Sequence, residues 1–129
     1  MQKTLLITGA SRQDPEWLAQ HGDGWMVYPR SVPAQARVIA DWRDRRRASG
    51  VGDKPVMQPL YVDLDEDPDA APQPIHLGFR LGSRQLSAHL RSLRDVGVNH
   101  VALNLRFNRA DVEATLRRLS VDVLPEFQE

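Results

Sequence analysis

Apolar and polar positions follow a repeated order along the chain: a short apolar run, a turn, and then a longer stretch with helical spacing. The apolar runs occupy residues 4–8, 25–28, 56–64 and 101–105. Short continuous apolar runs are typical of strands that are buried on both faces. Each run is followed by a stretch whose apolar residues recur every three or four positions, which predicts an amphipathic helix. The pattern therefore predicts four βα units of roughly 30 residues each.

Capping and breaking residues between the runs predict where the first two helices begin and end. Asp14-Pro15-Glu16 is a typical helix start, with a capping carboxylate, a proline at the first helical position and an acid in the first turn. We expect this helix to stop at Gly22. Ser31-Val32-Pro33 predicts the start of a longer helix that ends in the arginine-rich segment 43–47 and Gly50.

The last two helices are predicted in the same way. Gly97 is the expected stop of the third helix, and Asn108 is the expected cap of the fourth. Their apolar stripes are Leu86, Leu90 and Leu93 in the third helix, and Val112, Leu116 and Leu119 in the fourth.

The third apolar run and the segment after it depart from the simple pattern. Pro59 lies inside the run, and a proline within a strand indicates an edge position, a bulge or a break. An acidic, proline-rich loop is expected from Asp65 to Pro74. The loop continues into residues 74–80, an unusual mixture of apolar and cationic groups around His76.

Alternation of strands and helices predicts an α/β protein with a mainly parallel sheet. The 129 residues fit one domain. Four βα units are compatible with a small doubly wound domain. They are equally compatible with half of an eight-stranded barrel, whose usual length is about 250 residues.

Composition narrows the classes of function. The 17 basic and 17 acidic side chains balance, so neither nucleic acid nor an anionic membrane is an expected partner. The absence of cysteine excludes a disulfide framework, a thiol nucleophile and a zinc–thiolate site. The first apolar run is too short for a signal peptide, and no run approaches the ~18 residues of a membrane span. We expect a soluble, cytoplasmic protein.

The turn after the first strand is the first candidate site. Gly9, Ala10, Ser11 and Arg12 follow an apolar run and precede a helix. The further glycines of a dinucleotide-binding loop are missing, and no Tyr-x-x-x-Lys pair of a short-chain dehydrogenase follows. Backbone N–H groups, a hydroxyl and a guanidinium in such a turn suit a phosphate, while an ordinary strand-to-helix turn is the alternative.

Other chemistry-bearing patterns are weaker. The acidic series at residues 63, 65 and 67 lacks the glycine and the closing glutamate of a calcium loop. The four histidines have no metal-ligand spacing. Asn104 and Arg106 lie at the end of the fourth predicted strand, where parallel sheets and barrels bind ligands. These two residues are therefore better candidates than the charges on the helices.

Several stretches of the sequence also resemble one family. Residues 9–13, 21–25 and 28–30 resemble the latter half of a bacterial luciferase-like flavin monooxygenase. Residues 74–82 and 97–107 resemble a subgroup of luciferase-type oxidoreductases. The resemblance covers nearly the whole chain in order, and Ala10 is a mild departure at the small residue before the serine.

This resemblance implies a fold and a cofactor. Family members are (βα)8 barrels of roughly twice this length. They bind reduced FMN, or in some branches the deazaflavin F420, at the carboxyl ends of the strands. Residues 9–12 would follow strand five of such a barrel and contact the flavin phosphate. By the same resemblance, Arg80, Asn104 and Arg106 would lie near the flavin or a small-molecule substrate. The chain would be a single domain over residues 1–129, with strands five to eight.

The strands that the chain lacks lead to two functional hypotheses. A half-barrel would expose unpaired sheet edges and an apolar interior, so we expect it to pair with itself or with a complementary N-terminal half-barrel. In the first hypothesis the chain is the phosphate-binding half of a flavin-dependent oxidoreductase or monooxygenase. In the second it is a catalytically inactive half-barrel that self-associates as a structural or binding module.

Overall fold

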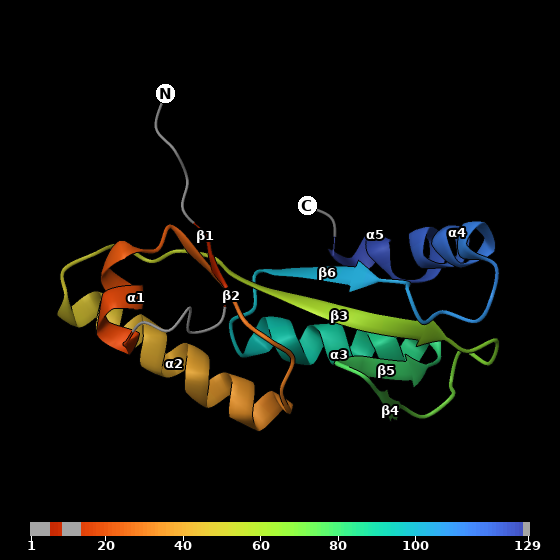
Figure 1. The fold of residues 1–129 in the computed structure, drawn as a ribbon. Coiled ribbons are helices and arrows are strands. Elements are labelled where there is room, and N and C mark those ends of the chain that lie inside the picture. Colours follow the sequence, from red (N-terminus) through yellow and green to blue (C-terminus); the bar gives the residue numbers. More distant parts are fainter. Residues whose placement is uncertain (1–5, 9–13, 128–129) are drawn as a thin grey trace. The chain divides into compact units, whose positions relative to one another are not determined.

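The protein is described here by a computed structural model, which describes residues 6–8 and 14–127. Strands and helices alternate along the chain (Figure 1), as the sequence predicts. The order is β1 (Leu6–Thr8), α1 (Pro15–His21), β2 (Gly24–Met26), α2 (Val32–Ala48), β3 (Val56–Leu64), β4 (Gln73–Ile75), β5 (Gly78–Leu81), α3 (Ser83–Asp95), β6 (His100–Asn104), α4 (Val112–Asp122) and α5 (Leu124–Phe127).

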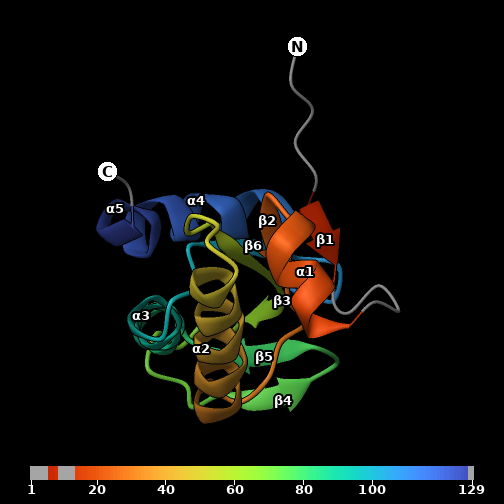
Figure 2. The same ribbon diagram turned by 90° about the vertical axis from the view of Figure 1, so that its left-hand side faces the viewer.

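The first two helices begin and end where the sequence predicts. The Asp14 side chain accepts a hydrogen bond from the N–H of Trp17 at 2.8 Å, and Gly22 follows the last residue of α1. The Ser31 hydroxyl accepts from the N–H of Ala34 and caps α2. The two helices pack against each other and lie side by side (Figure 2). Gly97, with a φ of 106°, follows the end of α3.

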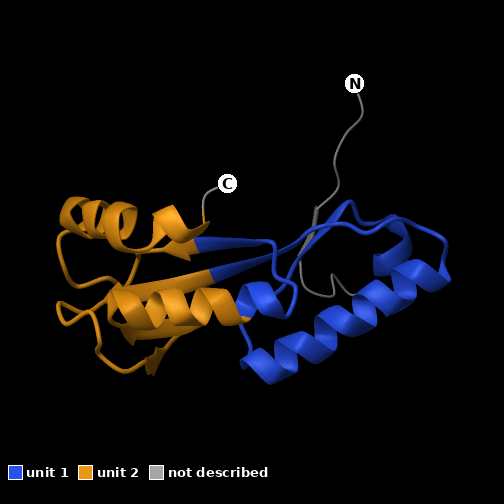
Figure 3. Ribbon diagram, turned by 180° about the vertical axis from the view of Figure 1, so that it is seen from behind, with its two compact units in different colours: residues 1–59, 93–102 blue, residues 60–92, 103–129 orange. Residues whose placement is uncertain are grey.

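The chain divides into two compact units (Figure 3). Unit 1 comprises residues up to Pro59 together with Leu93–Ala102, and unit 2 comprises Leu60–Ser92 and residues from Leu103 onward. The segments β3, α3 and β6 each contribute residues to both units.

Unit 1 is built on parallel strands. β1 pairs with β2, and Trp25 and Met26 of β2 stand opposite Val56 and Met57 of β3. Its core is apolar and is drawn from the helices and the strands together. The buried core residues are Ala19, Val27, Ile39, Trp42, Val56, Leu93 and Val98.

Unit 2 combines the carboxyl half of β3 with a hairpin that the sequence analysis assigned to a loop. β5 is parallel to β3, and β4 is antiparallel to β5. The alternation of strand and helix concealed this hairpin because β4 is only three residues long and is followed at once by a tight turn. Leu77 in that turn has a φ of 50°. Gly78 comes next, and a Cβ there would lie 1.8 Å from the carbonyl oxygen of Tyr61.

Pro59 does not place β3 at an edge or interrupt the strand. β3 runs unbroken from Val56 to Leu64 and pairs with β2, β5 and β6. The partner along one side changes at the proline, because the β2 register ends at Met57 and the β5 register begins at Tyr61. Pro59 therefore lies between the two registers, where its missing N–H costs no hydrogen bond to β2 or β5.

The start of the last helix also differs from the prediction. Asp111, not Asn108, caps α4, and its carboxylate accepts from the N–H of Ala114 at 3.0 Å. Of the predicted apolar stripe only Leu119 is buried, whereas Val112 and Leu116 are half exposed. Thr115 takes a buried position on this helix, and it does so because its hydroxyl is hydrogen-bonded to Asn108 and to the carbonyl of Asp111.

Candidate functional site

The carboxyl ends of β3 and β5 bring charged side chains together in unit 2. The two strands are parallel, and their register sets Asp63 opposite Arg80 and Leu64 opposite Leu81. Figure 1 shows the arrow of β6 pointing the same way as those of β3 and β5. Ligands of parallel sheets and barrels bind at this end of the strands. Unit 2 therefore has the features of a site at its strand ends.

Asp63 is the centre of this site. Only 4% of its surface is exposed. One carboxylate oxygen, Oδ2, accepts from Arg80 Nη1 at 3.0 Å and from Arg109 Nε at 2.8 Å. The other oxygen, Oδ1, accepts from the backbone N–H of Arg109 at 3.1 Å. Three donors therefore satisfy a carboxylate that burial would otherwise destabilise.

These contacts decide the charge of the buried carboxylate. Burial by itself raises the pKa of Asp63, but hydrogen bonds from the backbone and side chain of Arg109 and from Arg80 outweigh it and lower the pKa below the ordinary value. Asp63 is therefore ionised near neutral pH. It acts as a fixed negative charge that orients two guanidinium groups, and it is unsuited to serve as a general acid.

Arg80 is held by two carboxylates. Its Nη2 lies 3.0 Å from Asp65 Oδ2, while its Nη1 binds Asp63. The backbone carbonyl of Asp65 in turn accepts from Arg118 Nη1 at 2.9 Å. Because its charge is neutralised locally, Arg80 fixes the geometry of the strand ends, and an incoming anion would have to compete with two carboxylates for it.

Three aromatic rings lie close together beside the charged cluster around Asp63. Tyr61 on β3 lies 4.9 Å from Phe107 and 5.9 Å from His76 between ring centroids. His76 and Phe107 meet edge to face at 6.2 Å. Tyr61 and Asp63 are two residues apart on β3, so their side chains project from the same face of the strand. The exposed positions of His76 and Phe107 leave part of this aromatic cluster open to solvent.

Asn104 and Arg106 occupy the predicted strand end. The Asn104 side chain accepts from the backbone N–H of Arg106 at 2.9 Å and so shapes the turn after β6. The Arg106 guanidinium lies 5.6 Å from the ring centre of Phe107. Among the described residues, no carboxylate forms an ion pair with Arg106. It is therefore the cation beside the aromatic cluster that is available to an anionic group.

The other predicted site residues are not described. Gly9, Ala10, Ser11 and Arg12 lie outside the described residues, so their role as a phosphate-binding turn stays a prediction. The strand that precedes them, β1, ends at Thr8, and the helix that follows them, α1, starts at Pro15. A strand and a helix therefore flank these residues, as the prediction requires.

Sequence reasoning missed four residues of the site in unit 2. Asp63 was considered only as part of a failed calcium motif, and Tyr61, Phe107 and Arg109 were not singled out. The place of Asp63 in the sequence could have identified it as a site residue. It is one residue from the end of a buried strand, where an acid needs a specific partner. Nothing local indicates Arg109, because its contact with Asp63 spans 46 residues.

The described residues contain neither a membrane-spanning helix nor a cluster of metal ligands. None of the described helices is both long and apolar enough to cross a membrane. Among the same residues, no group of three or more His, Asp or Glu side chains is arranged to hold a metal ion.

Comparison with known proteins gives a likeness of fold. No family model matches the chain, and no curated protein sequence matches it. Among solved structures, the chain is similar to an F420-dependent secondary alcohol dehydrogenase in complex with an F420–acetone adduct, with a TM-score of 0.76 and 12% identity. It is also similar to the coenzyme F420-dependent tetrahydromethanopterin reductase of Methanopyrus kandleri (TM-score 0.73, 12%) and to DmoA from Hyphomicrobium sulfonivorans (0.68, 16%).

The coverage of these matches is uneven. They include 100%, 95% and 94% of this chain but only 50%, 50% and 40% of the other chains. The chain thus spans about half of the length of the structures that it matches. The likeness confirms the predicted fold class, an α/β chain that corresponds to half of a (βα)8 barrel.

Proposed function

We propose that this chain is the phosphate-binding half of a flavin-type oxidoreductase that uses reduced FMN or the deazaflavin F420. The observation that carries the proposal is the polar and aromatic site at the strand ends of unit 2, on a fold that is similar to two F420-dependent enzymes over almost its whole length.

The phosphate of the cofactor is assigned to the turn at residues 9–12. Backbone N–H groups at the start of a helix, the Ser11 hydroxyl and the Arg12 guanidinium form a suitable set of donors for it. Arg106, which no described carboxylate neutralises, is assigned to the vicinity of the flavin or the substrate. Arg80 and Asp63 serve as positioning residues that hold the strand ends.

The ring of the cofactor or a planar substrate is assigned to the aromatic cluster. Tyr61 and Phe107 offer ring faces and edges at 4.9 Å separation, and such groups bind planar molecules through stacking and exclude water from them. When bound, a reduced flavin or deazaflavin supplies the transferable electrons of the reaction. The residues of this chain bind and orient it, and Asn104 shapes the turn that carries Arg106.

The chain spans half of the compared structures, so activity is assigned to an assembly. The partner in the proposal is a complementary N-terminal half-barrel or a second copy of this chain. Apolar side chains exposed on α4 and next to it favour such an association: Val112, Leu116, Val121 and Leu124 are 50%, 54%, 73% and 38% exposed. The same observation favours the second candidate function, a self-associating half-barrel without catalysis.

The test is a titration of the purified chain with FMN, with F420 and with riboflavin, followed by the fluorescence of each compound, with the oligomeric mass measured in parallel. The proposal predicts saturable FMN binding and much weaker riboflavin binding. Ser11→Ala and Arg106→Gln should each weaken FMN binding about tenfold, as expected for one lost charge-assisted contact. Arg117→Gln is the matched control, since Arg117 is an exposed arginine on α4 paired with Glu113.

The two candidate functions differ in the outcome. Equal affinity for FMN and riboflavin, or equal affinity of all variants, would contradict the phosphate site. An oligomer that binds neither flavin nor F420 would instead support the self-associating module.

A further inference from the structure

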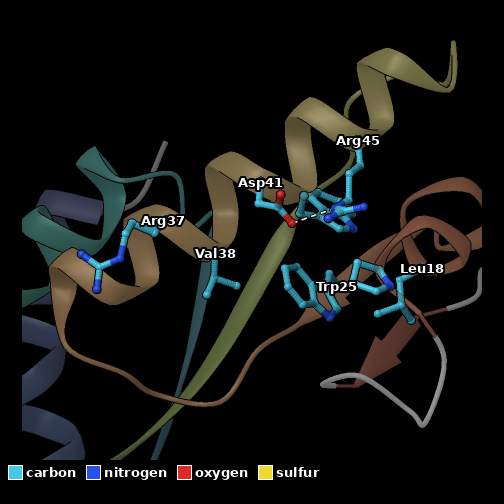
Figure 4. A pocket seen from close by; sticks show the side chains of 8 residues that line it. Leu18, Trp25, Arg37, Val38, Asp41 and Arg45 are labelled. Carbon is cyan, nitrogen blue, oxygen red and sulfur yellow. Dashed lines mark hydrogen bonds and ion pairs between the residues drawn. The ribbon is translucent and has the colours of Figure 1, made fainter.

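Unit 1 contains a cavity of about 420 Å³ on the side of β2 that faces the helices. Figure 4 shows it between α1, β2 and α2, with Leu18, Trp25 and Val38 around it. Binding sites for small molecules commonly have volumes of roughly 300–1,000 Å³. The cavity, which is open to solvent on one side, therefore has the size of a ligand site.

The walls of the cavity are mainly apolar and aromatic. Trp25 and Trp42 both line it and stack on each other, with ring centroids 5.6 Å apart and an angle of 29° between the planes. Leu18 and Trp42 are 4% and 3% exposed, so they are firmly held by the core. Rigid stacked rings suit a planar ligand, because they lose little conformational freedom when it binds.

The rim of the cavity is charged, and its charge is unbalanced. Asp41 and Arg45 form an i, i+4 ion pair at 2.8 Å along α2. The third charged lining residue, Arg37, has no ion-pair partner among the described residues. The rim therefore carries one uncompensated positive charge beside an apolar cavity.

From these observations we propose that unit 1 has its own small-molecule site, whose ligand is a planar aromatic compound with an anionic group such as a carboxylate. The ring lies against Leu18, Trp25 and Val38, and the anionic group meets Arg37. The site does not depend on the function proposed for the strand ends, since none of its lining residues belongs to that set. It gives the chain a second ligand-binding activity.

The experiment uses 2-naphthoate as the probe and the neutral 2-naphthamide as its isostere. Binding is followed by NMR of the indole N–H groups of Trp17, Trp25 and Trp42. We expect saturable shifts at Trp25 and Trp42 and none at the exposed Trp17. Val38→Phe fills the cavity and should weaken binding about tenfold. Ala114→Phe, at an exposed alanine of α4, is the control and should leave binding unchanged.

Charge recognition is tested separately. Arg37→Gln should weaken the binding of 2-naphthoate about fivefold, as expected for one exposed charge, and leave 2-naphthamide unaffected. The proposal is overturned if no saturable binding occurs at millimolar probe, or if Val38→Phe binds as well as the unmodified chain. Equal affinity of the unmodified chain for the two probes would overturn the assignment of an anionic ligand. Intact chemical shifts elsewhere in the variants show that they have folded.

Discussion

The two ends of β3 differ in chemistry although they belong to one continuous strand. At its amino end Val56 is fully buried in an apolar core with Ile39 and Trp42. At its carboxyl end Asp63 is buried as well, but as an ionised carboxylate that three donors from Arg80 and Arg109 satisfy. Burial therefore supplies stability at one end of the strand and fixes charge at the other, a division that is typical of parallel barrel strands.

Two arginines show the same difference. Arg46 in unit 1 is 3% exposed and donates to the carbonyl oxygens of Ala19, Gly22 and Gly52 at 2.7, 2.9 and 2.6 Å. Burial lowers its pKa, although neighbouring aspartates offset part of this effect. Arg80 in unit 2 instead binds two carboxylates. Arg46 therefore ties loop and helix ends together, while Arg80 orients the acids of the candidate site.

The largest expected effect is at the amino end. Ile39→Ala removes a side chain that is 1% exposed and leaves a cavity in the core of unit 1. We expect a loss of about 3–4 kcal/mol in the free energy of unfolding, measured by urea denaturation. Val112→Ala, at a half-exposed residue, should change it by less than about 0.5 kcal/mol. Similar losses of unfolding free energy in both variants would show that the apolar core of unit 1 is not the main source of stability.

A smaller effect is expected at the carboxyl end. Asp63→Asn removes the charge that holds Arg80 and Arg109 and should cost about 2 kcal/mol, because hydrogen bonds to charged groups contribute about 1.5–3 kcal/mol. The exposed Glu66→Gln is the control. The pKa of Asp63 is lower in the folded protein than in the unfolded chain, so its contribution is present above about pH 4 and is lost as pH falls further. If the stability of Asp63→Asn fell below pH 4 as steeply as that of the unmodified chain, this role of Asp63 would be contradicted.

The smallest effect concerns His89 on α3, which meets Phe79 edge to face at 5.0 Å. Burial lowers its pKa, so the unfolded chain binds a proton at a higher pH than the folded protein. Stability should therefore fall as pH drops below about 6.5, by less than about 1 kcal/mol. His89→Gln should show a shallower loss between pH 7 and pH 5 in thermal unfolding, whereas the exposed His21→Gln should keep it. An equal slope in both would exclude His89 as the source.

Local chemistry allowed much of the fold to be predicted. Asp14, Ser31 and Gly97 act through neighbours within a few residues, and the structure confirms each helix end that they indicate. Asn108 shows where this reasoning fails. Its side chain accepts from the N–H of Leu64, 44 residues away, and so the cap position falls to Asp111.

The candidate site was predictable only in part, for the same reason. Asn104 and Arg106 follow a recognisable strand, and their position at its end could be read from the sequence. The pairing of Asp63 with Arg80 depends on the β3–β5 register, which exists only because a short hairpin follows the acidic loop. The contact between Tyr61 and Phe107 likewise joins segments that no local pattern relates.

Amide hydrogen exchange of the chain with and without FMN tests most directly whether the strand ends carry the function. We expect slower exchange at residues 9–12 and 104–107, and unchanged exchange around Ile39 and at the amino end of β3. Protection at the amino end of β3, or no change at either set of residues under saturating FMN, would contradict the claim that the strand ends carry the function.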